Sequence, residues 1–410
     1  MRASEFLKLF EKAKQQPVSV SDQKSTPGDP NSDPLYSLKV AIAHKIKELP
    51  ASQETQNSLE EIEDILSHIN LGGRRQATST DFGSWTDEDV KKAKDLLAKY
   101  IVSLDSPVAY KRSMLAQWKE GGLIDTNLLL SGSHTIEEIV KGYTTNPAVK
   151  ELADDLMQVA SLGKGKGEFM LKVLSPIITD PPGGKGDILV KEVGTVEVKT
   201  TDGGAGRFYD RQVKAGPNFT SMSDRFIKTY GSYLVAQEPA ATPGNVNTPS
   251  QPISERPAKN PSVPKKPVAL AKTGINIDQL ATIYKNLPNE LKANFTKDLN
   301  DIISEVFQRA PQYAGAVVKA IMDGNAGKAK QLYGVGALNN YMAHKADIGI
   351  LYINLTAKPT TFTFFTDNAS LNAGGLRLQI ATAYPVSSGE QNAFPQTSIV
   401  ATAQTQPGIN

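Results

Sequence analysis

The sequence predicts a mixed α/β protein of the α+β kind, in which a small mixed sheet is combined with many helices. Apolar residues recur at helical spacing over long stretches on both sides of the middle of the chain. Shorter stretches near residues 187–200 and 348–383 are rich in β-branched residues and are separated by turn residues, as strands are. The 410 residues suffice for two or three domains with hydrophobic cores.

Shifts in composition divide the chain into seven segments. The clearest boundary is a stretch of closely spaced prolines that no packed helix or sheet tolerates. In order, the segments are an N-terminal helix over 1–15, a flexible linker over 16–35, a helical region over 36–162, a core of helix and strand over 163–235, the proline-rich linker over 236–272, a helical and β-rich C-terminal region over 273–385, and a disordered tail over 386–410.

Helices are expected in both helical regions, and strands on either side of the proline-rich linker. The expected helices are 37–49, 57–69, 85–101, 106–119, 134–142, 146–160, 168–174, 221–235, 276–287, 288–309, 311–322 and 326–343. The expected strands are 187–190, 194–200, 348–355, 360–366 and 376–383. The last three form a sheet of their own or complete the central sheet. The second option is favoured, because two strands are too few for a stable sheet.

The composition excludes several classes of chemistry. The chain has no cysteine, which rules out disulfides, thiol catalysis and cysteine-ligated metals. Its four histidines lie far apart and lack metal-ligand spacing, and no Gly-x-Ser-x-Gly motif is present. The net charge of +2 provides no global positive field, so any contact with nucleic acid must come from a local patch.

One strand-like run carries a charged pair. Alternate side chains of a strand share a face, so Glu197 and Lys199 point the same way and Val198 is buried behind them. Asp187 opens the preceding strand, and a tight reversal over 191–194 would bring it close to Glu197. Buried charges need partners or a metal ion. The sequence therefore predicts a polar site on adjacent strands.

Two converging carboxylates form a hard oxygen site that suits Mg²⁺, with Mn²⁺ as a substitute. Such an ion lowers the pKa of bound water and neutralises charge on a phosphate. Lys199 would orient that water and stabilise the transition state. Glu168, at the start of a helix, would add a ligand or hold a metal-bound water. A half-buried hairpin with solvated or ion-paired Glu197 and Lys199 is the structural alternative.

The order of these residues resembles the PD-(D/E)xK nuclease superfamily, which has the restriction-endonuclease-like fold. The matching residues are Asp187, nine intervening residues and then Glu197-Val198-Lys199, with Glu168 on an upstream helix. The resemblance covers about residues 160–235. It implies that Asp187, Glu197 and the Val198 carbonyl bind metal, that Lys199 assists the attacking water, and that the chain is a DNA endonuclease.

The chain departs from the family's pattern at one position. Gly186 stands directly before Asp187, where many members of the family have proline. That proline is the loosest part of the signature. Many nucleases of this fold work as dimers, so a homodimer is implied by the resemblance alone.

Basic residues around the motif are candidates for contacts with DNA phosphates. They are Arg207, Arg211 and Lys214 after the motif, and Lys164 and Lys166 in the glycine-rich stretch before it. A solvated basic turn explains the first three equally well. The glycine-rich stretch lacks the spacing of a nucleotide-binding loop. RNA remains an alternative substrate, because the site recognises phosphate and not sugar.

A second hypothesis is a non-catalytic structural or DNA-binding protein that retains the nuclease fold. The opening residues Met-Arg-Ala-Ser-Glu-Phe-Leu are similar to those of tailed-bacteriophage proteins, which implies a host bacterial cytoplasm or a virion, and phage proteins as partners. No apolar run approaches the ~18 residues that a membrane helix needs, and 1–15 lacks the pattern of a signal peptide. We therefore expect a cytoplasmic protein with no membrane partner.

Overall fold

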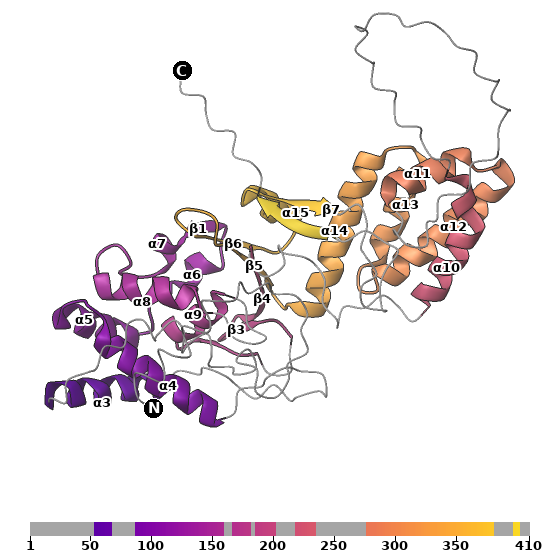
Figure 1. Ribbon diagram of the computed structural model, residues 1–410. Helices are drawn as coiled ribbons and strands as arrows, with labels where there is room; N and C mark the ends of the chain where they lie inside the picture. The colour runs from indigo at the N-terminus through magenta and orange to yellow at the C-terminus, as the bar shows by residue number, and fades with distance from the viewer. Residues whose placement is uncertain are drawn as a thin grey trace, which may run out of the picture. The chain divides into compact units, whose positions relative to one another are not determined.

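The computed structural model describes residues 53–67, 87–159, 166–181, 185–201, 218–234, 276–380 and 397–401. The helix and linker predicted over 1–35, the helix predicted over 37–49 and the proline-rich linker over 236–272 lie outside these residues. The chain divides into two compact units (Figure 1). Unit 1 comprises Met1–Arg207, Tyr341–Arg377 and Ser398–Asn410, and unit 2 comprises Phe208–Asn340 and Leu378–Thr397.

Unit 1 contains a six-stranded mixed sheet. Its strands are β1 (Ser133–Thr135), β2 (Ile178–Thr179), β3 (Ile188–Val190), β4 (Gly194–Thr200), β5 (Gly349–Asn354) and β6 (Thr361–Phe365). The strand order is β1-β6-β5-β4-β3-β2, and only β4 and β5 are parallel. The predicted mixed α/β class is confirmed. The strands predicted at 348–355 and 360–366 lie in the same sheet as β3 and β4.

Seven described helices of unit 1 share one hydrophobic core with this sheet. They are α3 (Gln53–Ser67), α4 (Asp87–Ser103), α5 (Val108–Lys119), α6 (Thr126–Leu129), α7 (Ile136–Ile139), α8 (Pro147–Met157) and α9 (Glu168–Leu174). A further described helix of unit 1, α15 (Asn368–Ala373), contacts β6. Trp118 of α5 and Leu152 of α8 belong to the same buried cluster as Val196 of β4 and Leu351 of β5. The boundary predicted between 162 and 163 therefore does not separate two structural units.

The two faces of β4 differ in polarity, because its side chains alternate. Val196 and Val198 of β4, with Ile353 of β5, face the core that the helices form. Glu197 and Lys199 therefore point to the opposite face. This alternation is what places charged side chains on a buried strand.

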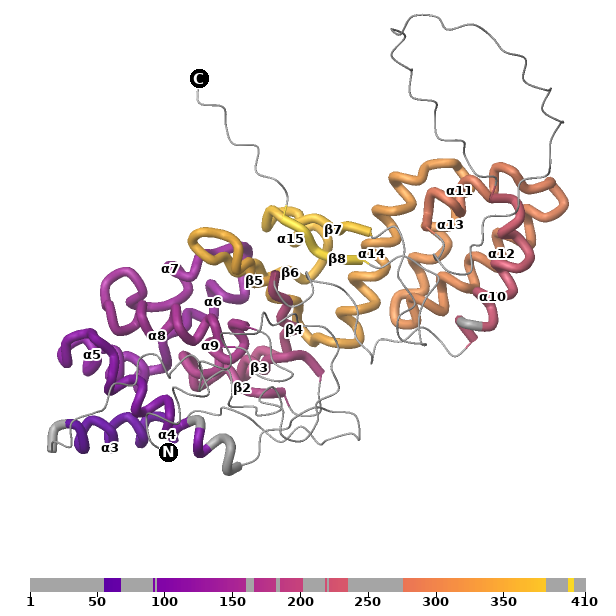
Figure 2. The backbone as a smooth tube through the Cα atoms, in the orientation of Figure 1, coloured from indigo at the N-terminus to yellow at the C-terminus, as the bar shows by residue number. Residues whose placement is uncertain are grey.

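Unit 2 is helical. It contains α10 (Phe219–Tyr230), η3 (Gly231–Tyr233), α11 (Ile277–Asn286), α12 (Asn289–Val306), η5 (Pro311–Tyr313), α13 (Ala314–Met322) and most of α14 (Ala326–Lys345). The tube in Figure 2 shows α10 beside α12 within this unit, and these two helices are in contact. The helices predicted over 276–343 are all present.

The helix predicted over 221–235 is present as α10 and η3, but it belongs to unit 2 and not to the core predicted over 163–235. The physical reason is an aromatic cluster. Phe226 and Tyr230 of α10 each lie 5.1 Å from Phe295 of α12, ring centroid to ring centroid. The apolar face of α10 is thereby buried in the helical unit.

Two further predictions are wrong in part. The helix expected over 134–142 is reduced to α7, because 133–135 pairs with β6 as an edge strand. The tail expected over 386–410 contains β8 (Thr397–Ala401), which pairs with β7 (Leu376–Ile380) in a separate two-stranded sheet. Burial alternates along β8, with Thr397 and Ile399 inside, and these β-branched residues favour a strand. None of the described helices has the length and apolar character needed to cross a bilayer.

Candidate functional site

The hairpin of β3 and β4 brings the predicted acidic residues together. The two strands pair antiparallel from Ile188 opposite Val196 to Val190 opposite Gly194, so three residues form the reversal. The N–H of Asp187 donates to the carbonyl of Val196 over 3.0 Å, which anchors Asp187 beside β4. The reversal expected over 191–194 is thus present.

The Asp187 carboxylate binds the backbone of the next strand. Its Oδ2 accepts the N–H of Val198 over 2.8 Å. Because the N–H and C=O of one strand residue point to the same side, the Val198 carbonyl lies on the side of β4 where Asp187 is found. The resemblance implied a metal ligand at this carbonyl.

Glu197 is the centre of the polar contacts. The residue is only 2% exposed, yet its Oε1 accepts two hydrogen bonds, from Lys199 Nζ over 2.6 Å and from the Tyr341 hydroxyl over 2.5 Å. Its Oε2 is buried and has no hydrogen-bond partner in the described part of the chain. The Lys199 side chain remains 17% exposed, and its Nζ lies 4.9 Å from the centroid of the Tyr341 ring.

The electrostatics of Glu197 favour a cation. Burial and the neighbouring charge of Asp187 raise the pKa of the Glu197 carboxyl, and the ion pair and hydrogen bonds from Lys199 and Tyr341 oppose that rise only in part. A buried carboxylate oxygen without a partner is costly. A hard divalent cation held by Asp187 and Glu197 would remove that cost, so these residues fit such an ion.

Gly186 occupies a position that proline could not take. Its φ is +76°, which proline cannot adopt because its ring holds φ near −65°. A Cβ at this position would lie 3.0 Å from the Thr195 Cβ and 3.1 Å from the Val196 carbonyl oxygen. The chain therefore reaches Asp187 through a backbone conformation that requires glycine.

Two ion pairs fix the chain on the approach to Asp187. Lys172 of α9 and Asp180 form a pair whose side chains are 1% and 6% exposed. Lys185 pairs with Asp347 over 2.5 Å, and the Thr195 hydroxyl donates to the same carboxylate over 2.7 Å. These contacts lower the pKa of the Asp347 carboxyl. Sequence reasoning missed both pairs.

Glu168 does not complete a three-carboxylate centre. It is buried at the start of α9, after Gly167. Among the described residues, no three or more His, Asp or Glu side chains are grouped so that they could hold one metal ion. The structure therefore groups Asp187 with Glu197 and does not add Glu168 as a third ligand, while the other role expected for Glu168, holding a metal-bound water, stays a prediction.

Most of the predicted phosphate contacts fall outside the described residues. Lys166 is described and partly exposed, just before α9. Lys164, Arg207, Arg211 and Lys214 lie outside the described residues.

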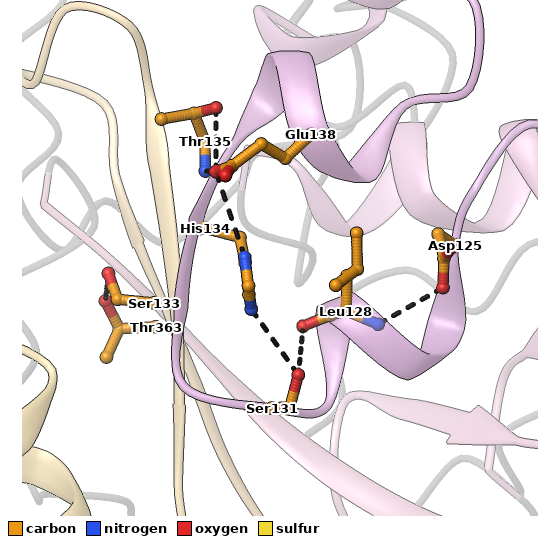
Figure 3. A network of polar contacts seen from close by, with 8 residues as sticks. All are labelled: Asp125, Leu128, Ser131, Ser133, His134, Thr135, Glu138 and Thr363. Carbon is orange, nitrogen blue, oxygen red and sulfur yellow. Dashed lines mark hydrogen bonds and ion pairs between the residues drawn. The ribbon is translucent and has the colours of Figure 1, made fainter.

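His134, in the edge strand β1, takes part in a network of local polar contacts (Figure 3). Its Nδ1 lies 3.8 Å from Glu138 Oε2, and its Nε2 lies 3.4 Å from the hydroxyl of Ser131. Glu138 also accepts the N–H of Thr135 over 2.6 Å. This network around His134 belongs to the capping box at the start of α7.

Sequence reasoning also missed Tyr341. Its contact with Glu197 spans 144 positions. The only signal was indirect, because the predicted helix over 326–343 precedes a strand that was expected to join the central sheet.

Comparison of the chain with protein-family models, with curated proteins and with solved structures gives no match in any of the three. The resemblance to the nuclease superfamily therefore rests on the sequence motif alone.

Proposed function

We propose that the chain is an endonuclease that hydrolyses phosphodiester bonds in DNA, with Mg²⁺ as cofactor and Mn²⁺ as its substitute. One observation carries the proposal: the buried Glu197 Oε2 has no hydrogen-bond partner among the described residues. The charge of a second carboxylate, that of Asp187, acts on the same group and raises the pKa of Glu197. A partly exposed lysine binds the other oxygen of the same carboxylate. This combination of groups supports the restriction-endonuclease-like reading of the core.

Each residue has a defined role in this proposal. Asp187, Glu197 and the Val198 carbonyl would hold the cation. When bound, the cation supplies charge neutralisation at a phosphate oxygen and a lower pKa for water. Asp187 also holds β4 through the N–H of Val198, so the carboxylate and the carbonyl keep a fixed relation.

Lys199 would act on the substrate. Its ammonium lies at the end of a partly exposed side chain and is already oriented by Glu197 and by the ring of Tyr341. An ammonium in that place orients the attacking water and stabilises the negative charge that builds up on the phosphate. We place no step on Glu168, because it is not grouped with the two carboxylates.

The decisive experiment is cleavage of supercoiled plasmid with Mg²⁺ or Mn²⁺. Lys199→Ala and Glu197→Gln should each reduce the rate by a factor on the order of 10²–10³, as the loss of a charge-stabilising group does. Lys150→Ala is the matched control. It removes a lysine from an equally short ion pair with Asp154, whose side chains are 53% and 43% exposed, and should leave cleavage unchanged.

The same assay decides the class of substrate. Single-stranded DNA and RNA, equal to each other in length, are tested in parallel with the plasmid. Metal-dependent cutting of RNA alone would replace DNA as the substrate. If no nucleic acid is cut with either metal by correctly folded protein, the proposal fails, and the non-catalytic structural or DNA-binding role takes its place.

A further inference from the structure

Tyr341 reaches Glu197 from the last part of α14. Its residue exposure is 1%, and its hydroxyl donates to Glu197 Oε1 over 2.5 Å. A buried tyrosine hydroxyl usually finds a hydrogen-bond partner, and a carboxylate is a strong one. The contact therefore fixes the Glu197 side chain as well as satisfying the hydroxyl.

The two oxygens of Glu197 are used differently. Oε1 accepts both Lys199 Nζ and the Tyr341 hydroxyl, whereas Oε2 has no hydrogen-bond partner in the described residues. Two donors on one oxygen define the orientation of the whole carboxylate. Oε2 is consequently the oxygen that remains for a ligand.

We propose that Tyr341 is a positioning residue for the cation site: its hydroxyl holds Glu197 so that Oε2 is presented to the metal. This inference rests on the proposed function, since it assumes that Asp187 and Glu197 bind a divalent cation. Groups that hold a metal ligand in place commonly contribute 10–100-fold to affinity. Tyr341 does not itself touch the cation or the substrate.

The ring of Tyr341 has a second, separable effect. Lys199 Nζ lies 4.9 Å from the ring centroid, within the range of a cation–π contact. Tyr341→Phe removes the hydroxyl and keeps the ring beside Lys199. Tyr341→Leu removes both. The first variant therefore tests the contact with Glu197, and the second adds the loss of the contact with Lys199.

The test is a titration with Mn²⁺, in which the electron paramagnetic resonance signal of the free ion measures how much Mn²⁺ is bound. Wild type, Tyr341→Phe, Tyr341→Leu and Glu197→Gln are compared, with Tyr333→Phe as the matched control. Tyr333 lies in the same helix, is 2% exposed and packs against Phe307 in the core of unit 2. Plasmid cleavage is measured over the same range of Mn²⁺.

Tyr341→Phe should weaken Mn²⁺ binding about 10-fold, as expected for a group that orients a ligand. The Mn²⁺ concentration for half-maximal cleavage should rise by the same factor, while the rate at saturating Mn²⁺ recovers. Tyr341→Leu should also lower the saturated rate, because Lys199 loses its ring contact. Tyr333→Phe should bind Mn²⁺ as wild type does.

Three results overturn the inference. If Tyr341→Phe binds Mn²⁺ as tightly as wild type, Tyr341 is not a positioning residue, although the proposed function stands. If Tyr333→Phe weakens binding as much as Tyr341→Phe, the effect is a general loss of stability. If wild type binds no Mn²⁺, or binds it as weakly as Glu197→Gln, the proposed function and the inference fail together.

Discussion

A single residue, Gly186, allows the chain to lie close to β4 just before β3 begins. Gly186 has a φ of +76° and packs against Thr195 and Val196, and the next residue supplies one of the two carboxylates. A side chain at this position would meet both backbone strain and a close contact. The geometry of the site therefore depends on a residue that has no functional group in its side chain.

Gly186→Ala should destabilise the protein by more than the ~1–2 kcal/mol that a left-handed conformation costs a non-glycine residue. Gly324→Ala is the control, because its φ of +71° is similar and nothing lies within 4 Å of its added Cβ. Urea unfolding should show a smaller loss for Gly324→Ala, and only Gly186→Ala should impair cleavage. Equal losses in stability would show that the contact with Thr195 is relieved without strain.

Among single residues, the sequence predicted those site residues that are brought together by one strand or by one short hairpin. Glu197 and Lys199 share a face because of the two-residue period of a strand, and the short reversal makes Asp187 their neighbour. Tyr341 and Asp347 could not be predicted in the same way. Their contacts with Glu197 and Thr195 span 144 and 152 positions, and no periodicity extends over that distance.

Among the elements, α10 and α12 are joined by a polar contact as well as by aromatic packing. The Tyr230 hydroxyl donates to Asp298 Oδ2 over 2.9 Å. Burial, the hydrogen bond and the charge of Asp298 raise the pKa of the Tyr230 hydroxyl from 10.0 to about 12. The neutral, donating form is therefore favoured in the folded state.

Tyr230→Phe should lower the free energy of unfolding by about 1 kcal/mol at pH 7, because Asp298 loses a donor. The folded pKa is the higher one, so this contribution is complete below pH 10 and is lost as the pH rises towards 12. The difference between variant and wild type should shrink over that window in urea unfolding. Tyr284→Phe, on the neighbouring α11, is the control. A difference that stays constant to pH 12 would contradict the assigned cause.

Helices and strands could be predicted from the sequence where the spacing of apolar residues extended over many positions. α11 and α12 follow the 3.6-residue period and lie where it indicated. α14 lies where a helix was predicted, but its apolar residues are not confined to one face. β1 and β2 have three and two residues, too few to show alternation. The period also predicted α10 as a helix but could not assign it to a unit, because Phe295 lies beyond the proline-rich linker in sequence.

On the scale of the whole molecule, the larger segment of unit 2, Phe208–Asn340, lies in the sequence between the first two segments of unit 1. β5 is the parallel neighbour of β4 in the middle of the sheet, and it follows unit 2's helices along the chain. Without β5, one side of β4 would be left as an unpaired edge. A chain that ended before Tyr341 would also lose the hydroxyl that binds Glu197.

A chain that ends at Asn340 should therefore lose the cooperative fold of unit 1 while α11, α12 and α13 stay protected. Limited proteolysis with mass spectrometry should show rapid cleavage within 87–201, and metal-dependent cutting of plasmid should be absent. Removal of residues 402–410 alone is the control and should change neither result. Full protection of 87–201 in the shortened chain would show that β5 and β6 are dispensable for unit 1.

The parallel pairing of β4 with β5 has a consequence for synthesis on the ribosome. Thr195 and Asp347, which are hydrogen-bonded at the start of these strands, are 152 positions apart. At ~5–20 residues per second, translation of that interval takes on the order of ten seconds. During that delay β4 has no parallel partner, and the backbone N–H and C=O groups that later pair with β5 form an open edge that other strands could join.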